Sequence, residues 1–560
     1  MKSTKGLGSK STKLVASILL SVLSVFFTAC GGAAGGTAPT PNGNGNGSSQ
    51  APTATVSVNP TSITAGQSAT LTWQTANATS VSIDSIGTVQ PSGTMTVHPS
   101  QSTTYHLVAT GAGGTQDAST SLTVNAAADI TAVNHILIMF QENRSFDSYF
   151  GAMTDYRTRN NIPINSSDGK IRDLSDPAAQ VAAAKNISPL TGQAILPTHF
   201  GSVCTEDLTP DWGETHKEMN LHDSAAAGPD SPMDGFVNVA QGLSQFYGVL
   251  ADKDGHRAMG FFDDHDLNFY YFMASNFAMG DMFFSPAPTR TTANRLFIHA
   301  ATSQGHVHAD EDVGGLTAKT IWRALDEKGV TWKIYVSDWN TNKFTFFNDF
   351  IDSGDPKRRA NIVSIDQYFA DLQAGTLPQV AFVETGMFSG RDEHPSNNPG
   401  QGIVAPPIDV QVGAAWVQQV IQALMTSSSW KDSAFFFAFD EGGGAFDHVP
   451  PVKVPNPDGI KPTDLFAGDP PGDFTITGFR IPNFIVSPFA KKNYVSHTPM
   501  DYTAILKFIE TRFGMKPLNA RDASMPDMTE FFDFTNGGPW ATPPSPPVQN
   551  KTGVCDYTKQ

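Results

Sequence analysis

The fold follows from the stretch His135-Ile-Leu-Ile-Met-Phe-Gln-Glu-Asn-Arg-Ser-Phe-Asp147, together with the later stretch Phe435-Phe-Phe-Ala-Phe-Asp-Glu-Gly-Gly-Gly-Ala-Phe-Asp-His448. Each contains a short, continuous apolar run that ends abruptly in acids and amides. Such runs are typical of strands buried in a parallel sheet, with helices on both faces. Ligands bind to such sheets just beyond the carboxyl ends of the strands. The sequence therefore predicts an α/β fold with a ligand site where these two runs end.

The residues that end both runs predict a metal site. Converging carboxylates repel one another unless a cation joins them, and hard oxygen ligands suit a divalent metal. The expected metal ligands are Glu142, Asn143, Asp440 and Glu441. The pattern does not indicate which divalent metal binds.

The net charge argues against one class of partner. The chain has 560 residues and a formal charge of −17. A nucleic acid backbone requires a basic face, so we expect no nucleic acid partner. A small phosphorylated substrate remains compatible, because a bound metal inverts the local field.

Apolar segments alternate with segments of helical periodicity from about residue 129 onward. Expected strands are Ile136–Phe140, Thr331–Val336, Val380–Val383, Ala434–Phe439 and Phe484–Val486. Expected helices are Thr317–Leu325, Ile365–Leu372, Ala414–Met425 and Thr503–Phe513. This alternation predicts a mostly parallel sheet flanked by helices. The Gly/Pro-rich segments Asp392–Pro407 and Pro451–Thr475 predict loops around a site.

The N-terminus has the features of a targeting segment. Four lysines precede the apolar stretch Leu14–Phe27, which is short for a membrane span. Small residues before Cys30 resemble a bacterial lipobox. We therefore interpret residues 1–29 as a lipoprotein-type signal peptide; the alternative is an ordinary signal peptide that contains a cysteine. The prediction is an exported lipoprotein, anchored through Cys30 on the periplasmic or cell-surface side.

Two further segments precede the α/β region. Residues 30–52 are rich in Gly, Asn, Pro and Ser and predict a flexible linker. In residues 53–127, short alternating segments are separated by turn residues, which predicts an antiparallel sandwich with Trp73 in its core. This segment resembles bacterial immunoglobulin-like modules. It is interpreted as a spacer or as a binding module, and residues 129–560 as the catalytic domain.

Two cysteines remain in the expected exported part, Cys204 and Cys555. Thiols of exported proteins often pair, and this pair would pin the C-terminal tail to the catalytic domain. Two unrelated thiols are the alternative, since the sequence does not set their geometry.

A third stretch supplies a candidate nucleophile. In Ser285-Pro-Ala-Pro-Thr-Arg-Thr-Thr-Ala-Asn-Arg295, a turn gives way to a helical pattern. A hydroxyl at a helix start faces unpaired N–H groups and the positive end of the helix dipole, which suits a group that must hold a phosphoryl group. A metal contacting that oxygen lowers its pKa. An ordinary capping turn is the alternative interpretation.

Five motifs occur in order: Glu142–Gly151, Met233–Phe236, Pro288–Arg295, Asp392–Pro395 and Asp440–Pro451. Together they resemble the bacterial phosphoesterase family of phosphatidylcholine-type phospholipases C and acid phosphatases. The resemblance implies an alkaline-phosphatase-like core and metal-assisted hydrolysis of phosphate esters. It also implies that Thr291 is both a metal ligand and the nucleophile, which forms a phosphothreonine intermediate.

The nucleophile motif departs from the family's usual form, Pro-Thr-x-Pro-Asn-Arg. Ala293 replaces the second proline, and Thr289 competes with Thr291 for the nucleophile's place. Asn294 and Arg295 are candidates for binding the substrate phosphate; the alternative is that they cap and brace the nucleophile helix.

Three histidines have expected catalytic roles. His394 matches a family position near the phosphate and is expected to contact a phosphoryl oxygen or protonate the leaving alcohol. His216 stands where the family has another site histidine, and His448 follows Asp447 in an Asp-His pair. A structural role is the alternative for each.

The sequence therefore predicts a metal-dependent phosphoesterase acting on phosphate esters, with a phospholipid diester and a phosphomonoester both open as substrate. A related sulfatase or phosphonate hydrolase is one alternative. Another is a surface adhesin that retains the fold as a binding module. Phenylalanines at 261–262, 283–284 and 344–350 would line a lipid-accepting mouth or, as the alternative, belong to the core. The oligomeric state is not readable from the sequence.

Overall fold

The computed structural model describes residues 50–64, 68–99, 101–125, 129–308, 313–340, 345–395 and 407–560. The predicted signal peptide, Cys30 and the linker up to residue 49 lie outside the described residues. Within the described ranges, no helix is both long and apolar enough to cross a membrane.

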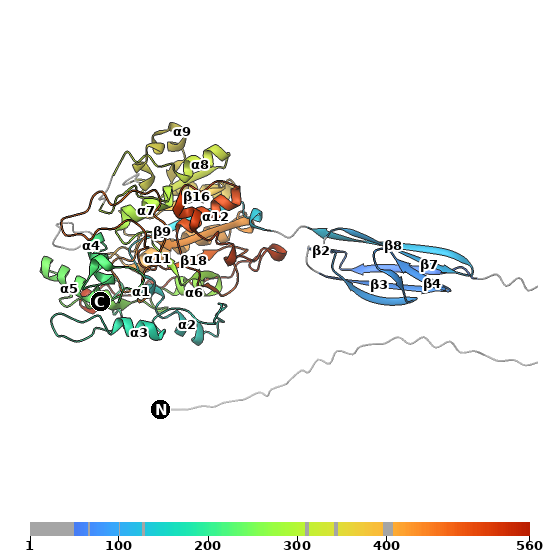
Figure 1. The fold of residues 1–560 in the computed structure, drawn as a ribbon, viewed down its shortest axis with the longest axis horizontal. Coiled ribbons are helices and arrows are strands. Elements are labelled where there is room, and N and C mark those ends of the chain that lie inside the picture. The colour runs from blue at the N-terminus through green and yellow to red at the C-terminus, as the bar shows by residue number, and fades with distance from the viewer. Residues whose placement is uncertain are drawn as a thin grey trace, which may run out of the picture. The chain divides into compact units, whose positions relative to one another are not determined.

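An eight-stranded sheet forms the centre of the α/β region (Figure 1). Its strands, in spatial order, are β15 (Ile362–Ser364), β14 (Trp332–Val336), β16 (Val380–Glu384), β9 (His135–Gln141), β17 (Ser433–Phe439), β18 (Asn483–Val486), β12 (Ala278–Gly280) and β19 (Tyr494–Ser496). Neighbouring strands are parallel except where β18 lies between β17 and β12. The predicted mostly parallel sheet is confirmed.

All five expected strands are present, each with bounds within one residue of those expected at either end. The strand at Asn483–Val486 runs antiparallel to β17. Its sequence does not indicate this direction, because a strand buried on both faces has the same continuous apolar pattern whether it is parallel or antiparallel to its neighbour. Strands β12, β15 and β19 were not predicted. Each has three residues, too few to show a period.

The helices of the α/β region are α1 (Phe146–Phe150), α2 (Met153–Arg159), α3 (Pro177–Ala183), α4 (Trp212–Met219), α5 (Phe236–Tyr247), α6 (Asn268–Asn276), α7 (Thr291–Ala300), α8 (Ile321–Lys328), α9 (Pro356–Arg359), α10 (Ile365–Ala374), α11 (Val410–Met425), α12 (Thr503–Phe513) and α13 (Ala520–Ser524). The four expected helices correspond to α8, α10, α11 and α12. Helix α8 begins four residues later than expected, because the Thr320 side chain caps it by accepting from the Arg323 N–H.

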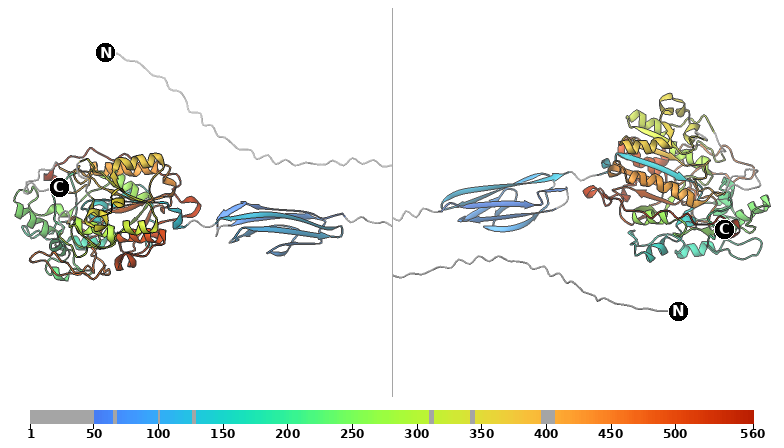
Figure 2. Two further views of the ribbon diagram at one scale, coloured as in Figure 1. Left: turned by 90° about the horizontal axis from the view of Figure 1, so that it is seen from above. Right: turned by 180° about the vertical axis from the view of Figure 1, so that it is seen from behind.

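The helices cover both faces of the sheet (Figure 2). Successive side chains of a strand point to opposite faces. In β17, Phe436 contacts Phe508 of α12, whereas the next residue, Phe437, contacts Tyr270 of α6. Helices α12 and α6 therefore lie on opposite faces of the sheet.

Strand register brings the two acidic strand ends together. Strands β9 and β17 are parallel neighbours, and Gln141 pairs with Phe439 at their ends. The residues that follow, Glu142 and Asp440, thus leave the sheet side by side. Strand β16 lies on the other side of β9 and ends in Glu384, so a further carboxylate reaches the same edge.

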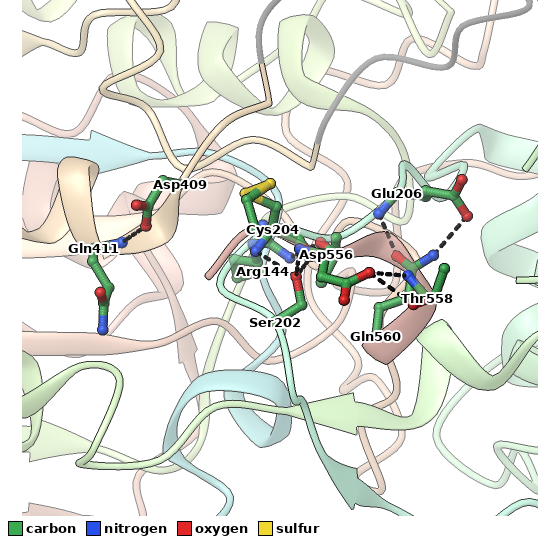
Figure 3. Close-up of a disulfide and its surroundings, with 11 residues drawn as sticks. Arg144, Ser202, Cys204, Glu206, Asp409, Gln411, Asp556, Thr558 and Gln560 are labelled. Atoms are coloured by element: carbon green, nitrogen blue, oxygen red, sulfur yellow. Dashed lines mark hydrogen bonds between the residues drawn. A yellow bond between two sulfur atoms is a disulfide. The ribbon is translucent and has the colours of Figure 1, made fainter. Parts of the chain in front are cut away.

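The C-terminal tail is covalently attached to this region. Cys204 and Cys555 form a disulfide, with their Cα atoms 4.9 Å apart (Figure 3). The predicted pairing is confirmed, and with it the attachment of the tail to the catalytic region. The Gly201 N–H also donates to the Lys559 carbonyl oxygen at 2.8 Å.

The phenylalanines that were candidates for a lipid-accepting mouth belong to the core. The side chains of Phe262, Phe283, Phe284 and Phe347 are at most 2% exposed. Phe261 is partly exposed, and Phe344 lies outside the described residues. The core interpretation is favoured because side chains without access to solvent offer no surface to a lipid.

The N-terminal segment is built of strands. They are β1 (Thr53–Asn59), β2 (Ser62–Thr64), β3 (Ala69–Ala76), β4 (Ser80–Ile83), β5 (Gly87–Val89), β6 (Ser92–Val97), β7 (Thr103–Gly111) and β8 (Gly114–Asn125). One sheet has the order β1-β3-β6 and the other β2-β8-β7-β4-β5. Trp73 is buried, as expected, and its indole N–H donates to the Gln90 carbonyl oxygen. The immunoglobulin-like assignment and the domain boundaries stay predictions.

Candidate active site

The start of helix α7 meets the acidic strand ends. Thr291 is the first residue of α7, and its hydroxyl donates to Asn143 Oδ1 at 3.0 Å. The Asn143 N–H in turn donates to Asp440 Oδ1 at 3.0 Å. Thus Thr291, the turn after β9 and the turn after β17 converge at one place.

The turn after β9 depends on glycine. Asn143 has a φ of +61°, in the left-handed region that few residues other than Gly, Asn and Asp adopt readily. Gly443 lies against it: a Cβ added there would come within 2.2 Å of the Asn143 carbonyl oxygen. The glycine run after β17 therefore allows the turn after β9 and the turn after β17 to contact each other directly.

Arg295 lies at the centre of the carboxylates. It is one turn along α7 from Thr291 and fully buried. Its guanidinium contacts Glu142 Oε1 at 2.8 Å and Asp440 Oδ2 at 3.3 Å. Burial alone would lower the Arg295 pKa, but the surrounding carboxylates raise it instead. Arg295 is therefore charged and compensates part of the buried negative charge.

Two buried acids were missed by the sequence analysis. Glu384 Oε2 lies 3.6 Å from Arg295 Nη1, and Glu384 directly follows the apolar run of β16. The rule applied to the two other runs would have found it. Glu218 is buried on α4, and Gly444 lies against it, since a Cβ there would be 3.1 Å from Glu218 Oε1. No sequence signal marks Glu218, because an acid inside a helical segment is usually exposed.

Buried carboxyl groups lie close to one another at this edge of the sheet. Burial and the nearby Asp440 carboxylate raise the pKa of Glu142, although Arg295 opposes the shift. Burial and Asp440 also raise the pKa of Glu441. Within the described part of the chain, Glu441 Oε1 is buried without a hydrogen-bond partner. An all-oxygen donor set with an unpartnered carboxylate oxygen fits a divalent cation.

The geometry favours Thr291 over Thr289 as the reactive hydroxyl. The Thr289 hydroxyl is buried and donates to the Val307 carbonyl oxygen. Thr291 is partly exposed, and its hydroxyl points to the Asn143 side chain. Thr289 therefore supports the turn, whereas Thr291 is accessible to a substrate.

For both candidate substrate-binding residues, Asn294 and Arg295, the structure favours the alternative role of bracing the start of α7. The Asn294 amide is fully buried: Nδ2 donates to the Thr289 carbonyl oxygen at 2.6 Å, and Oδ1 accepts from the Ala287 N–H at 2.9 Å. The Arg295 guanidinium is held by the strand-end carboxylates. The Tyr502 hydroxyl also donates to the Asn294 carbonyl oxygen, so α12 supports α7.

His394 lies close to the acidic strand ends. The preceding loop contacts β9 directly, because the Glu142 N–H donates to the Asp392 carbonyl oxygen at 2.9 Å. Burial would lower the His394 pKa, but the carboxylates of Asp207, Glu142 and Asp392 raise it. A partly exposed, charge-stabilised imidazole here is suited to donate a proton.

His216 and His448 are not joined to Thr291 by any contact among the described residues. His216 Nδ1–H donates to the Trp212 carbonyl oxygen at 2.6 Å, and its side chain lines a cavity of about 360 Å³. His448 Nδ1 lies 2.6 Å from Asp147 Oδ2, in a buried cluster completed by Arg480. Their catalytic roles stay predictions, and for His448 the geometry favours a structural role.

The sequence model of the phosphoesterase family matches residues 133–516. The chain belongs to the phosphoesterase family. It is therefore a hydrolase that acts on phosphoric esters, as the five motifs indicated, and its substrates are phosphate esters. The residues of the site just described lie inside the matched range.

Several characterised phospholipases C are similar to this family member. Phospholipase C B of Mycobacterium tuberculosis is 29% identical over 471 residues, which cover 75% of this chain and 80% of that protein. Non-specific phospholipase C1 of Arabidopsis thaliana is 29% identical over 433 residues, 71% of each chain. A solved Vibrio parahaemolyticus protein of the alkaline phosphatase superfamily matches with 13% identity and a TM-score of 0.29, covering 62% of this chain and 78% of that one.

Proposed function

We propose that this phosphoesterase is a metal-dependent phospholipase C-type enzyme with Thr291 as its nucleophile, on an alkaline-phosphatase-like core. One observation carries the proposal: the Thr291 hydroxyl donates to Asn143 at the edge where buried carboxylates converge. A hydroxyl in that position has both a helix N-terminus and an oxygen-rich cation site beside it.

The residues that would hold the metal are Glu142, Asn143, Thr291, Asp440 and Glu441. A divalent cation bound there would lower the pKa of a hydroxyl and neutralise charge on a phosphoryl group. Arg295 would remain behind the carboxylates and keep them oriented through its contacts with Glu142 and Asp440.

The proposed reaction has two steps, formation of a phosphothreonine and its hydrolysis. The Thr291 hydroxyl loses its proton to solvent as its oxygen attacks phosphorus in line. The bond from phosphorus to the alcohol oxygen breaks, a phosphothreonine forms, and the alcohol leaves with a proton from His394. The now neutral imidazole takes a proton from a water molecule that attacks the phosphothreonine; the bond to Thr291 breaks, the Thr291 oxygen regains a proton from solvent, and phosphate or a phosphomonoester is freed. The first N–H groups of α7 face the phosphoryl oxygens and stabilise their charge.

A phospholipid diester is the first candidate substrate, and a phosphomonoester is the second. The similar proteins of Mycobacterium and Arabidopsis carry the name phospholipase C, which favours the diester. A sulfate ester is the remaining alternative within the enzyme class, and it serves as a negative substrate in the test.

The test compares three substrates before and after metal removal. Purified protein should hydrolyse phosphatidylcholine faster than a nitrophenyl phosphate monoester, and it should leave a nitrophenyl sulfate intact. Dialysis against a chelator should lower turnover at least about 100-fold, and one divalent metal should restore it. Turnover that a chelator leaves unchanged would contradict the proposed metal dependence. A preference for the monoester would contradict only the proposed diester substrate.

We also propose that the enzyme is exported and anchored through a lipid on Cys30, with the strand-rich segment 53–127 as a spacer. The disulfide supports export, because such bonds persist in oxidising compartments. In fractionated cells, wild-type activity should sediment with membranes, and a Cys30→Ala variant should release it into the soluble fraction. Equal distribution of the two forms would contradict the anchor.

A further inference from the structure

The residue after the proposed ligand Asn143 is held in an unusual way. Arg144 is buried, with 3% of its surface exposed. Its Nη1 donates to the Thr205 hydroxyl at 3.0 Å, and its Nε and Nη2 donate to the Glu393 carbonyl oxygen at 3.2 and 2.8 Å. These hydrogen-bond partners are a neutral hydroxyl and a neutral carbonyl, and the Tyr149 and Phe262 rings lie beside the guanidinium. The hydrogen bonds that orient Arg144 therefore depend on where the hydroxyl and the carbonyl are held.

Arg144 is linked to the site on its backbone side as well. Its N–H donates to the Glu441 carbonyl oxygen at 3.0 Å, which joins the turn after β9 to the turn after β17. A shift of the Arg144 side chain would therefore move Asn143 relative to Asp440 and Glu441. Groups that orient metal ligands in this way commonly change metal affinity by about 10- to 100-fold.

The loop that carries Thr205 is fastened on both sides of that residue by the C-terminal tail (Figure 3). On one side, Cys204 forms the disulfide with Cys555. On the other, the Glu206 N–H donates to Gln560 Oε1 at 2.6 Å, and Gln560 Nε2 donates back to Glu206 Oε2 at 2.6 Å. Thr205 thus lies between two tail contacts.

Apolar burial contributes only part of what holds the tail in this position. Tyr557 packs, partly buried, against the core, and no side chain between residues 551 and 560, all of which the structure describes, is fully buried. Backbone bonds add to the disulfide: the Val203 N–H donates to the Val554 carbonyl oxygen at 3.2 Å, and the Asp556 N–H donates to Ser202 Oγ at 3.0 Å. The covalent link therefore joins a mostly exposed segment to the Thr205 loop, in addition to the contacts that the loop makes with the Ala251 and Asp252 N–H groups through Glu206.

We infer that Thr205 is a positioning residue for the metal-ligand turn and that the disulfide-bonded tail sets its place. The tail fixes the position of Thr205, the Thr205 hydroxyl fixes the Arg144 side chain, and Arg144 fixes the adjacent Asn143. The expected change in metal affinity rests on the proposed function, whereas the expected change in backbone hydrogen exchange of the turn does not.

The first test compares Thr205→Val, which keeps the shape but removes the hydroxyl, with Thr205→Ser, which keeps the hydroxyl. Calorimetry measures the affinity for Mn²⁺. Separately, mass spectrometry measures hydrogen exchange of the backbone N–H groups in residues 142–148 of the metal-free protein. Thr205→Val should weaken Mn²⁺ binding about tenfold and raise exchange in this segment, whereas Thr205→Ser should remain within about twofold of wild type.

The second test acts on the tail. The double variant Cys204→Ser/Cys555→Ser should weaken Mn²⁺ binding and raise exchange in residues 142–148, as Thr205→Val does. Lys551→Ala, an exposed change in the same tail, should do neither.

The outcomes separate this inference from the proposed function. Unchanged exchange in both Thr205→Val and the cysteine variant overturns the inference, even if wild type binds Mn²⁺. Raised exchange in a protein that binds no divalent metal supports the positioning role and overturns the metal-dependent function. A Thr205→Ser variant as impaired as Thr205→Val also overturns the inference, because the hydroxyl would then not be the cause.

Discussion

Thr291→Ala is expected to lower turnover on the order of 10³-fold or more, with little change in stability. The substitution removes the hydroxyl at the start of α7 that donates to Asn143 at the acidic edge, and with it the oxygen proposed to attack phosphorus. The position is partly exposed, so loss of the side chain leaves no buried cavity. Thermal unfolding and steady-state turnover on the preferred substrate measure the two effects.

Thr289→Ala is the matched control for this prediction. It removes a hydroxyl two residues earlier that donates to the Val307 carbonyl oxygen, so it should cost about 1 kcal/mol of stability and leave turnover within about tenfold of wild type. After acid quenching, mass spectrometry should find phosphothreonine at position 291 in wild type. Near-normal turnover in Thr291→Ala, or phosphate on Thr289 instead, would reverse the assignment.

The second large effect is on stability. Arg295→Ala is expected to lower the free energy of unfolding by about 3–5 kcal/mol in the absence of divalent metal. The guanidinium is fully buried and contacts Glu142 and Asp440, so its removal leaves buried carboxylates without their positive partner. Urea-induced unfolding of the metal-free protein measures the change.

Arg290→Ala provides the comparison for Arg295→Ala. Arg290 precedes α7 and is about one-third exposed, with its Nε 3.4 Å from Asp211 Oδ1. Loss of such a partly solvated pair should cost less than about 1 kcal/mol. Adding a divalent cation should reduce the difference in the free energy of unfolding between Arg295→Ala and wild type, because the cation supplies positive charge at the same edge. A loss below about 1 kcal/mol for Arg295→Ala would show that the carboxylates are not left charged and unpaired.

The central strands were predictable because each has a strong local pattern. The runs at 136–140 and 434–439 are continuously apolar and end in acids, and the structure places both in the middle of the sheet. The short strands β12, β15 and β19 were not predictable, since three residues show no period. Glu384 was predictable, because it ends the apolar run of β16 much as Glu142 comes just after that of β9.

Side-chain partners were the least predictable part of the site. Thr289 and Thr291 are equivalent in sequence, and only the packed turn shows that one donates to Val307 and the other to Asn143. Arg295 belongs to a motif, but the sequence does not show that its guanidinium is directed into the sheet edge. Glu218 carries no signal at all, because its burial results from contact with a distant glycine turn.

The amino-acid sequence by itself determined the alternating α/β plan, the family and the chemical types at the site: carboxylates at strand ends and a threonine at the start of a helix. Only the tertiary structure decided which of these groups meet, which threonine is accessible, and that Cys204 pairs with Cys555. The reason is physical. A local apolar pattern reports where the chain enters and leaves the core, whereas convergence of residues 142, 291 and 440 depends on strand order and register, which contacts between distant segments set.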